Sequence, residues 1–302
     1  MAESRRGLLL GLAAYSCWGL FPLYWPLLEP GGATEILGHR MVWSMLVMVL
    51  LVLVVRRHEH LLRLLRNRRT ALLLIAAAVV ITVNWGVYIW GVNNEHVVET
   101  SLGYFINPLV TVLMAVVILG ERLRRLQWIA VGIATVAVVV LTVGYGRPPW
   151  VALVLAVSFG TYGLLKKTAG AGAVESLTLE TLVVGPFAVG FLVWLGATGG
   201  GHFTGHGADH IALLVGSGIV TAIPLLCFGG AATRIPMTTL GLMQYLTPTI
   251  QFAIGVGIRG EDMSTERWIG FGLVWVALLV FTIESLTHHR RSLQLSAEAS
   301  AA

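Results

Sequence analysis

The feature that most restricts how this chain can fold is a series of ten long apolar runs. A helix needs about 20 mostly apolar residues to cross the hydrocarbon of a bilayer, which is about 30 Å thick. Only 12% of the residues are charged, whereas a soluble domain has about 25%. We therefore predict an all-α polytopic membrane protein with ten transmembrane helices. The runs cover residues 7–27, 35–55, 71–92, 99–119, 127–144, 150–165, 176–196, 210–230, 238–258 and 268–286.

The same composition limits the function. A chain this apolar is not a cytosolic enzyme, a nucleic-acid-binding protein or a disordered protein. The sequence has no HExxH, P-loop or GxSxG motif, so we expect no enzymatic activity and no cofactor. Cys17 and Cys227 both lie in apolar runs, which is not the pattern of a disulfide framework. Arg5 and Arg6 precede a long apolar run that we interpret as a retained first helix rather than a signal peptide.

The distribution of Lys and Arg predicts the orientation. With the N-terminus inside, the inner segments carry 16 basic residues and the outer segments carry three, while Arg40 lies within a span. We therefore expect both termini in the cytoplasm and a multi-pass protein of the inner (plasma) membrane. The basic run 56–69 is explained by this topology and by contact with anionic lipids, so no nucleic-acid partner is expected.

An internal repeat with an offset of 140 residues predicts the domain organisation. Each copy has an apolar run with an internal proline, a Gly-Glu turn and a tryptophan that opens the next run. A unit of five spans is odd, so its two copies enter the membrane in opposite directions, as in alternating-access transporters. We expect a first repeat at 1–145, a second repeat at 146–286 and a disordered tail at 287–302. The matched pairs are Pro108 and Pro248, Gly120 and Gly260, Glu121 and Glu261, Trp128 and Trp268, and Gly132 and Gly272.

Two charged residues inside spans are candidate functional groups. Arg40 lies about five residues into its span, where a cation costs roughly 2.5–3.5 kcal/mol unless it is paired or hydrated. We expect Glu99, at matching depth, to be its partner in an outer gate or site; the alternative is snorkelling to the headgroups. Glu180 lies at the equivalent inner depth. It either carries a proton, because burial favours the neutral carboxyl, or pairs with Lys166 or Lys167.

Prolines, aromatic rings and amides suggest the remaining site. Asn107-Pro108 and Thr247-Pro248 lie in the middle of equivalent spans, where proline frees a carbonyl and favours a hinge or a site. Deep aromatic side chains and amides could line a cavity for an amphipathic solute, or they could simply pack the helices. The predicted substrate-binding residues are Trp18, Arg40, Trp85, Asn93, Tyr104, Asn107, Gln244 and Tyr245. The predicted coupling or gating residues are His39, Arg40, Glu99, Glu180, Pro108 and Pro248.

A histidine cluster between two spans is a weaker candidate. His202, His206 and His210 would share a face of a helix and could bind zinc. The glycines around them, such as Gly199 and Gly205, argue against a helix there. We therefore predict no metal site.

Several segments resemble the RarD-like branch of the EamA family, within the drug/metabolite transporter superfamily. The resemblance covers about residues 7–285 and implies ten helices in two inverted five-helix repeats and a permease for small solutes. The family is often labelled with chloramphenicol sensitivity. The segments are EILGHRMVWS (35–44), NWGVYIWGVNN (84–94), SLGYFINPL (101–109), LGER (119–122), AVSFGTYGLLKK (156–167), PLLCFGGAATR (224–234) and TLGLMQYLTPT (239–249).

These observations together predict a secondary transporter that exports a small amphipathic metabolite or drug by alternating access, driven by protons. The expected partners are the small-molecule substrate, protons and membrane lipids, with no obligate protein partner. An uncoupled facilitator of a neutral solute is the alternative. A non-transporting membrane subunit and an intramembrane enzyme are further alternatives, but neither needs two oppositely oriented halves.

Overall fold

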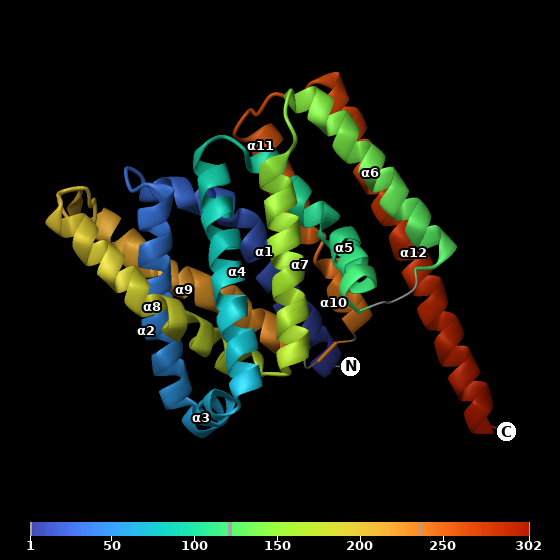
Figure 1. Cartoon of the computed structure of the whole chain (residues 1–302), viewed down its shortest axis with the longest axis horizontal. Coiled ribbons are helices and arrows are strands. Elements are labelled where there is room, and N and C mark those ends of the chain that lie inside the picture. Colours follow the sequence, from blue (N-terminus) through green and yellow to red (C-terminus); the bar gives the residue numbers. More distant parts are fainter. Residues whose placement is uncertain (1, 120–122, 233, 236, 302) are drawn as a thin grey trace.

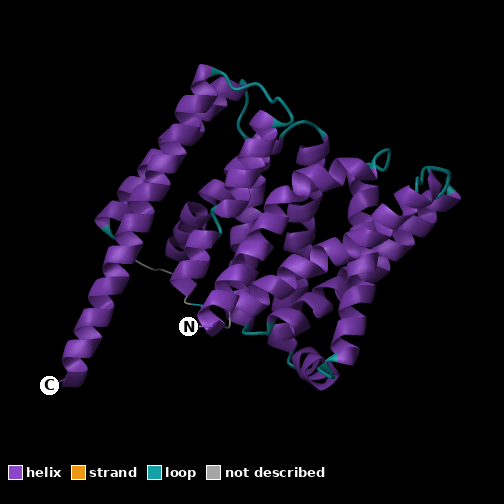
Figure 2. Ribbon diagram, turned by 180° about the vertical axis from the view of Figure 1, so that it is seen from behind, coloured by secondary structure: helices purple, strands orange, loops and turns teal. Residues whose placement is uncertain are grey.

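The computed structural model describes residues 2–119, 123–232, 234–235 and 237–301. Within those ranges the chain forms helices and loops and no strand, which confirms the all-α prediction (Figure 2). The helices are α1 (Ala2–Tyr24), the 3₁₀ helix η1 (Trp25–Leu28), α2 (Ala33–Val54), α3 (His58–Arg66), α4 (Arg68–Asn93), α5 (Val97–Leu119), α6 (Arg125–Tyr145), α7 (Trp150–Ala169), α8 (Ala173–Ala197), α9 (Gly207–Ala232), α10 (Met237–Met243), α11 (Leu246–Gly257) and α12 (Thr265–Ala301).

The helices are long and apolar enough for a multi-pass membrane protein. In the described part of the chain, eight of them can cross a membrane by length and composition. They lie in α1, α2, α4, α5, α6, α8, α9 and α12. The other two predicted spans differ: 150–165 lies in α7, whose apolar helix Trp150–Lys166 is shorter, and 238–258 is divided between α10 and α11.

The break between α10 and α11 has a local cause in the sequence. Proline has no N–H, and its ring clashes with the carbonyl of the residue four positions earlier. For Pro248 that residue is Gln244, which lies between α10 and α11. Pro248 therefore falls in the first turn of α11, where proline is tolerated. Its repeat counterpart Pro108 instead lies inside the continuous helix α5.

The packing follows a small set of helix pairs. Helix α1 packs against α9 and α11, and α7 packs against α4 and α5. Helix α2 packs against α8 and α9, and α4 also contacts α8. Helices α6 and α12 run side by side along one edge of the bundle (Figure 1). Helices far apart in sequence therefore share interfaces, which brings side chains of the first and second halves of the chain together.

Three segments differ from the sequence expectations or lie outside the structure. The predicted disordered tail is helical as far as Ala301, as an extension of α12 beyond the bundle (Figure 1). Its Ala, Leu, Gln and Glu residues favour helix. The basic connection 56–70 contains the short helix α3. The first Gly-Glu turn, at Gly120 and Glu121, lies outside the described residues.

Candidate functional site

Arg40 lies inside the bundle and is surrounded by aromatic rings. It belongs to α2 and is only 3% exposed. Its guanidinium carbon lies 3.9 Å from the ring centroid of Trp85, 4.9 Å from Trp25 and 5.8 Å from Phe21. Its Nε donates to Thr221 Oγ1 on α9 at 3.0 Å. Cation–π contacts of this kind offset part of the cost of burying the charge.

The expected pair between Arg40 and Glu99 is wrong. Glu99 instead binds Arg147, with Nη2 and Oε2 2.7 Å apart, and accepts the N–H of Val151 at 3.0 Å. Glu99 lies in the first turn of α5, where it meets the α6–α7 connection, whereas Arg40 is seven residues inside α2. Among the residues that the structure describes, no carboxylate forms an ion pair with Arg40, and its buried Nη1 has no hydrogen-bond partner.

A buried polar network around Gln251 connects α11, α1 and α4. The Nε2 of Gln251 donates to the carbonyl of Trp18 at 3.2 Å and to the hydroxyl of Tyr88 at 2.9 Å. The rings of Tyr88 and Tyr104 are 5.7 Å apart, edge to face. Gln251 and Thr221 were not among the residues predicted from the sequence. A polar side chain within an apolar run was the available signal for Gln251.

A second network connects α5, α4 and α7. Tyr104 donates its hydroxyl to Asn84 Oδ1 at 3.3 Å. Asn84 in turn donates to the Leu155 carbonyl at 3.1 Å and to Ser158 Oγ at 2.9 Å. Asn107 lies one turn further along α5 from Tyr104, and its Oδ1 accepts from the hydroxyl of Thr111 at 3.4 Å. The two networks and the rings around Arg40 therefore bring together helices from both halves of the chain.

Three predicted substrate residues lie away from Arg40's immediate contacts. Asn93 is the last residue of α4. Gln244 lies at the break between α10 and α11. Tyr245 packs against the apolar cluster formed by α5, α6, α7 and α12. Of the predicted residues, Trp85 contacts Arg40 directly, and Trp18 and Tyr104 belong to the adjoining networks.

Glu180 has its own partners. This carboxylate is 2% exposed on α8. It accepts from Lys166 Nζ at 2.9 Å and from the Tyr162 hydroxyl at 3.0 Å, and Lys166 also donates to Ser176. The structure therefore contains the Lys166 pair, one of the two alternatives that the sequence left open.

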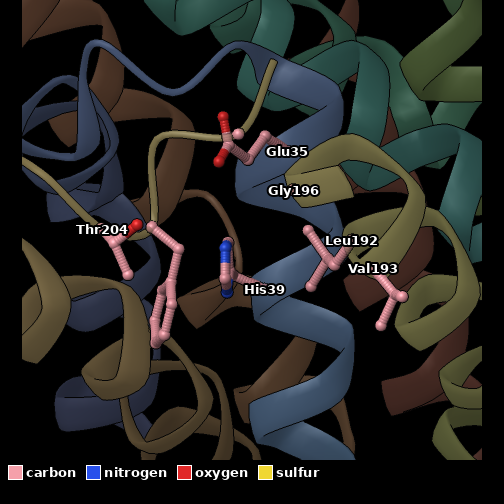
Figure 3. Close-up of a pocket in the computed structure, with 8 residues that line it drawn as sticks. Glu35, His39, Leu192, Val193, Gly196 and Thr204 are labelled. Atoms are coloured by element: carbon pink, nitrogen blue, oxygen red, sulfur yellow. The ribbon is translucent and has the colours of Figure 1, made fainter. Parts of the chain in front are cut away.

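A pocket opens beside the other face of α2. Glu35 and His39 lie on the same side of this helix, opposite Leu192 and Val193 of α8 and near Thr204 (Figure 3). The pocket has a volume of about 280 Å³. Glu35 accepts from the N–H of His202 at 2.6 Å and contacts its Nδ1 at 2.8 Å. The ring of His39 stacks on Phe203 with centroids 4.8 Å apart.

The three histidines of the predicted cluster lie near this pocket. The rings of His202, His206 and His210 follow one another at 5.5 Å between centroids. Only His210 is helical, because α9 begins at Gly207. In the described ranges no three His, Cys, Asp or Glu side chains come together as metal ligands.

The second Gly-Glu turn caps a helix of the other half. Gly260 has a positive φ of 67°, a conformation that glycine adopts without strain. Glu261 then accepts the N–H groups of Val97 at 2.5 Å and Val98 at 2.9 Å, at the start of α5. Burial raises the pKa of the Glu261 carboxyl, and these two N–H donors oppose the increase only in part. A carboxylate at a helix N-terminus is also favoured by the helix dipole.

Comparison with known proteins identifies the family. Residues 5–143 match the EamA-like transporter family. Protein RarD of Streptomyces exfoliatus is 58% identical over 290 residues, covering 96% of this chain and 92% of the relative. An uncharacterized transporter of Vibrio cholerae is 40% identical and covers 94% of both chains. A crystal structure of a protein at 16% identity has a TM-score of 0.60 over 92% of this chain and 97% of that chain, which supports the fold. This chain therefore belongs to the EamA-like transporter family, in its RarD-like branch, and is a multi-pass membrane transporter.

Proposed function

We propose that this transporter is a secondary exporter of a small amphipathic metabolite or drug and works by alternating access. It has two inverted five-helix repeats, at 1–145 and 146–286, and ten membrane spans in the inner (plasma) membrane. The excess of Lys and Arg in the proposed inner segments supports cytoplasmic termini. The region that matches the family ends at residue 143, which fits a boundary near 145.

The reciprocal pairing of the helices is the observation that carries this proposal. The offset of 140 residues relates α1 to α7, α2 to α8, α4 to α9, α5 to α10 and α11, and α6 to α12. Under this exchange the contacts of α1 with α9 and α11 become the contacts of α7 with α4 and α5. In the pairs α2–α8, α5–α11 and α6–α12, each helix packs against its own repeat counterpart, so the exchange leaves these three contacts unchanged. Two halves with equivalent interfaces can exchange conformations, which is the physical basis of alternating access.

The proposed substrate site lies among α1, α2, α4 and α9. Arg40, Trp85 and Trp18 contribute to it directly or through the adjoining network, and Tyr104 and Asn107 extend it along α5. In this proposal the ion pair between Glu99 and Arg147 lies at the outer end of the substrate site. His39 lines the pocket beside α2, which we place on the outer side. Pro108 and the break at Pro248 are the proposed hinges, because neither helix keeps all of its backbone hydrogen bonds there.

Glu180 is the proposed proton carrier. In this proposal its carboxylate either pairs with Lys166 or binds a proton. One proton moving down 100 mV supplies about 2.3 kcal/mol, enough for roughly 50-fold accumulation of a solute. When Lys166 moves away, the buried carboxylate takes up a proton because an isolated charge is costly there. An uncoupled facilitator remains the second candidate, because the Lys166 contact already compensates the charge of Glu180.

The test measures proton flux into proteoliposomes that contain a trapped pH dye. Amino acids, chloramphenicol and small aromatic solutes are added one at a time under a pH gradient. We expect solute-dependent proton movement that is lost in Glu180→Gln. Glu175→Gln is the matched control. Glu175 lies in the first turn of the same helix, α8, and its Oε1 forms an ion pair with Arg57 Nη1 at 2.9 Å. Proton movement that persists in Glu180→Gln would rule out this carrier, and counterflow of a solute without proton movement would favour the facilitator.

A further inference from the structure

Among the residues that the structure describes, Arg40 differs from the buried glutamates in how its charge is compensated. Each buried glutamate of the described ranges has a basic partner, whereas Arg40 has aromatic rings and one hydroxyl. The glutamate pairs are Glu35 with His202, Glu99 with Arg147, Glu175 with Arg57, Glu180 with Lys166 and Glu284 with Arg124. A buried cation without an anion is costly in a membrane protein, and intramembrane charges are typically functional.

We propose that Arg40 binds the carboxylate of the transported solute, so that the substrates are small monocarboxylates with an apolar or aromatic body. This inference rests on the proposed transport function and specifies its substrate class. It also states which protein group recognises the substrate.

The geometry of the guanidinium favours a carboxylate. A guanidinium has five N–H donors in a planar fork, which matches the two oxygens of a carboxylate. In Arg40 the hydrogen bond to Thr221 uses Nε, and the buried Nη1 has no partner among the described residues. A guanidinium stacks on rings through its face and donates through its edge. The contacts with Trp85 and Trp25 therefore leave edge donors for a ligand.

The surroundings of Arg40 favour a single negative charge and an apolar body. In the part of the chain that the structure describes, no second basic side chain joins Arg40 in its hydrogen bond or ring contacts. A doubly charged phosphate would lack its second counter-charge here. The rings of Phe21 and Trp25 are buried and make these surroundings apolar. Trp85 is only partly buried, and its ring is the one on which an aromatic or aliphatic body can pack. Thr221 belongs to the second half of the chain and the rings belong to the first, so a solute bound here contacts both halves.

The test compares three matched solutes on the purified protein in nanodiscs. They are N-benzoylglycine, its neutral amide N-benzoylglycinamide, and the cation N-(2-aminoethyl)benzamide; a naphthoyl series repeats the comparison. Binding is measured by tryptophan fluorescence and by the shift in the unfolding temperature. We expect each carboxylate to bind at least about tenfold more tightly than its amide and its amine, because only the carboxylate matches the guanidinium. Equal binding of the amide or amine, or no binding of any carboxylate, would overturn the proposal.

Variants of Arg40 locate the effect. We expect Arg40→Gln to reduce carboxylate affinity at least about tenfold and to leave the weak amide binding unchanged. Arg40→Lys keeps the positive charge but loses the planar set of N–H donors. We therefore expect its carboxylate affinity to lie between those of the wild type and of Arg40→Gln. Arg259→Gln is the control, because Arg259 is exposed at the end of α11 and donates to the Val92 carbonyl. Carboxylate affinity retained in Arg40→Gln would contradict the assignment. The comparison among solutes on the unmodified protein does not depend on the folding of any variant.

Counterflow in proteoliposomes separates this inference from the function on which it rests. Transport of neutral or cationic amphipathic solutes with no preference for the carboxylate would leave the transporter proposal intact and overturn the substrate class. Carboxylate binding that depends on Arg40, without counterflow of any solute, would support the site and overturn the transport proposal.

Discussion

Arg40 and Glu180 lie 140 residues apart, at equivalent positions of the proposed repeats, yet their charges are compensated in different ways. Glu180 has Lys166 and Tyr162 within hydrogen-bond distance. Arg40 has three aromatic rings and Thr221, with no carboxylate partner in the described ranges. Glu180 is therefore compensated within the protein by Lys166. Arg40 has no ionic partner among the described residues, and in our proposal its charge is left for a solute.

The largest expected effect comes from removing Lys166. Lys166→Met leaves Glu180 buried without its cation, which should lower the free energy of unfolding by on the order of 3 kcal/mol. Arg40→Met should cost far less, because it removes a charge for which the described residues supply no ionic partner. Unfolding in mixed micelles measures both changes. Equal losses for the two variants would contradict the comparison, and Lys166→Met combined with Glu180→Gln should recover most of the stability.

An intermediate effect is expected at Trp85, whose ring lies closest to the guanidinium. Trp85→Leu should lower the free energy of unfolding in the wild-type background by more than in the Arg40→Met background. The coupling energy should be about 1–2 kcal/mol, the value of a desolvated cation–π contact. A double-mutant cycle measures it. A coupling near zero would show that the rings only fill space around Arg40 and do not stabilise its charge.

The smallest expected effect is at Glu261, a carboxylate held by backbone N–H groups outside the spans. Burial raises its pKa above the usual 4.5. Folding therefore favours its protonated form. This contribution is fully present below the unfolded pKa and is lost as the pH rises through the raised value. The stability of the wild type relative to Glu261→Gln should fall over this acidic range, as measured by unfolding temperature against pH. A difference that stays constant or increases with pH would contradict this account.

Much of the helical architecture follows from the sequence, because apolar runs of this length have few other ways to fold. The apolar runs predicted the polytopic fold, and depth in a span singled out Arg40 and Glu180. The break before Pro248 was not predicted, because the sequence analysis expected one continuous span at 238–258. The matching Pro108 leaves α5 continuous, so a proline alone does not specify whether a helix breaks. The partners of the charged side chains were harder to predict. Glu99 at matching depth suggested a pair with Arg40, but the two residues face different neighbours.

The residues that sequence reasoning missed share a physical cause. Thr221 and Gln251 act through contacts between helices that are distant in the sequence. Such contacts depend on the rotation and packing of each helix, which a single sequence does not specify. For the tail after residue 286, the difficulty lay in local composition and not in contacts between distant helices. Its polar composition suggested disorder, while its helix-favouring residues continue α12.

Exchange of labelled N-benzoylglycine across proteoliposome membranes tests the role of Arg40 in transport, with protein-free liposomes to measure passive leakage. We expect rapid exchange against the unlabelled carboxylate but not against its amide. Arg40→Gln should lose this exchange, whereas Glu180→Gln should lose the accumulation that a pH gradient drives. Exchange that is equally fast with the amide, or that survives in Arg40→Gln, would contradict the claim that Arg40 receives the charge of the solute.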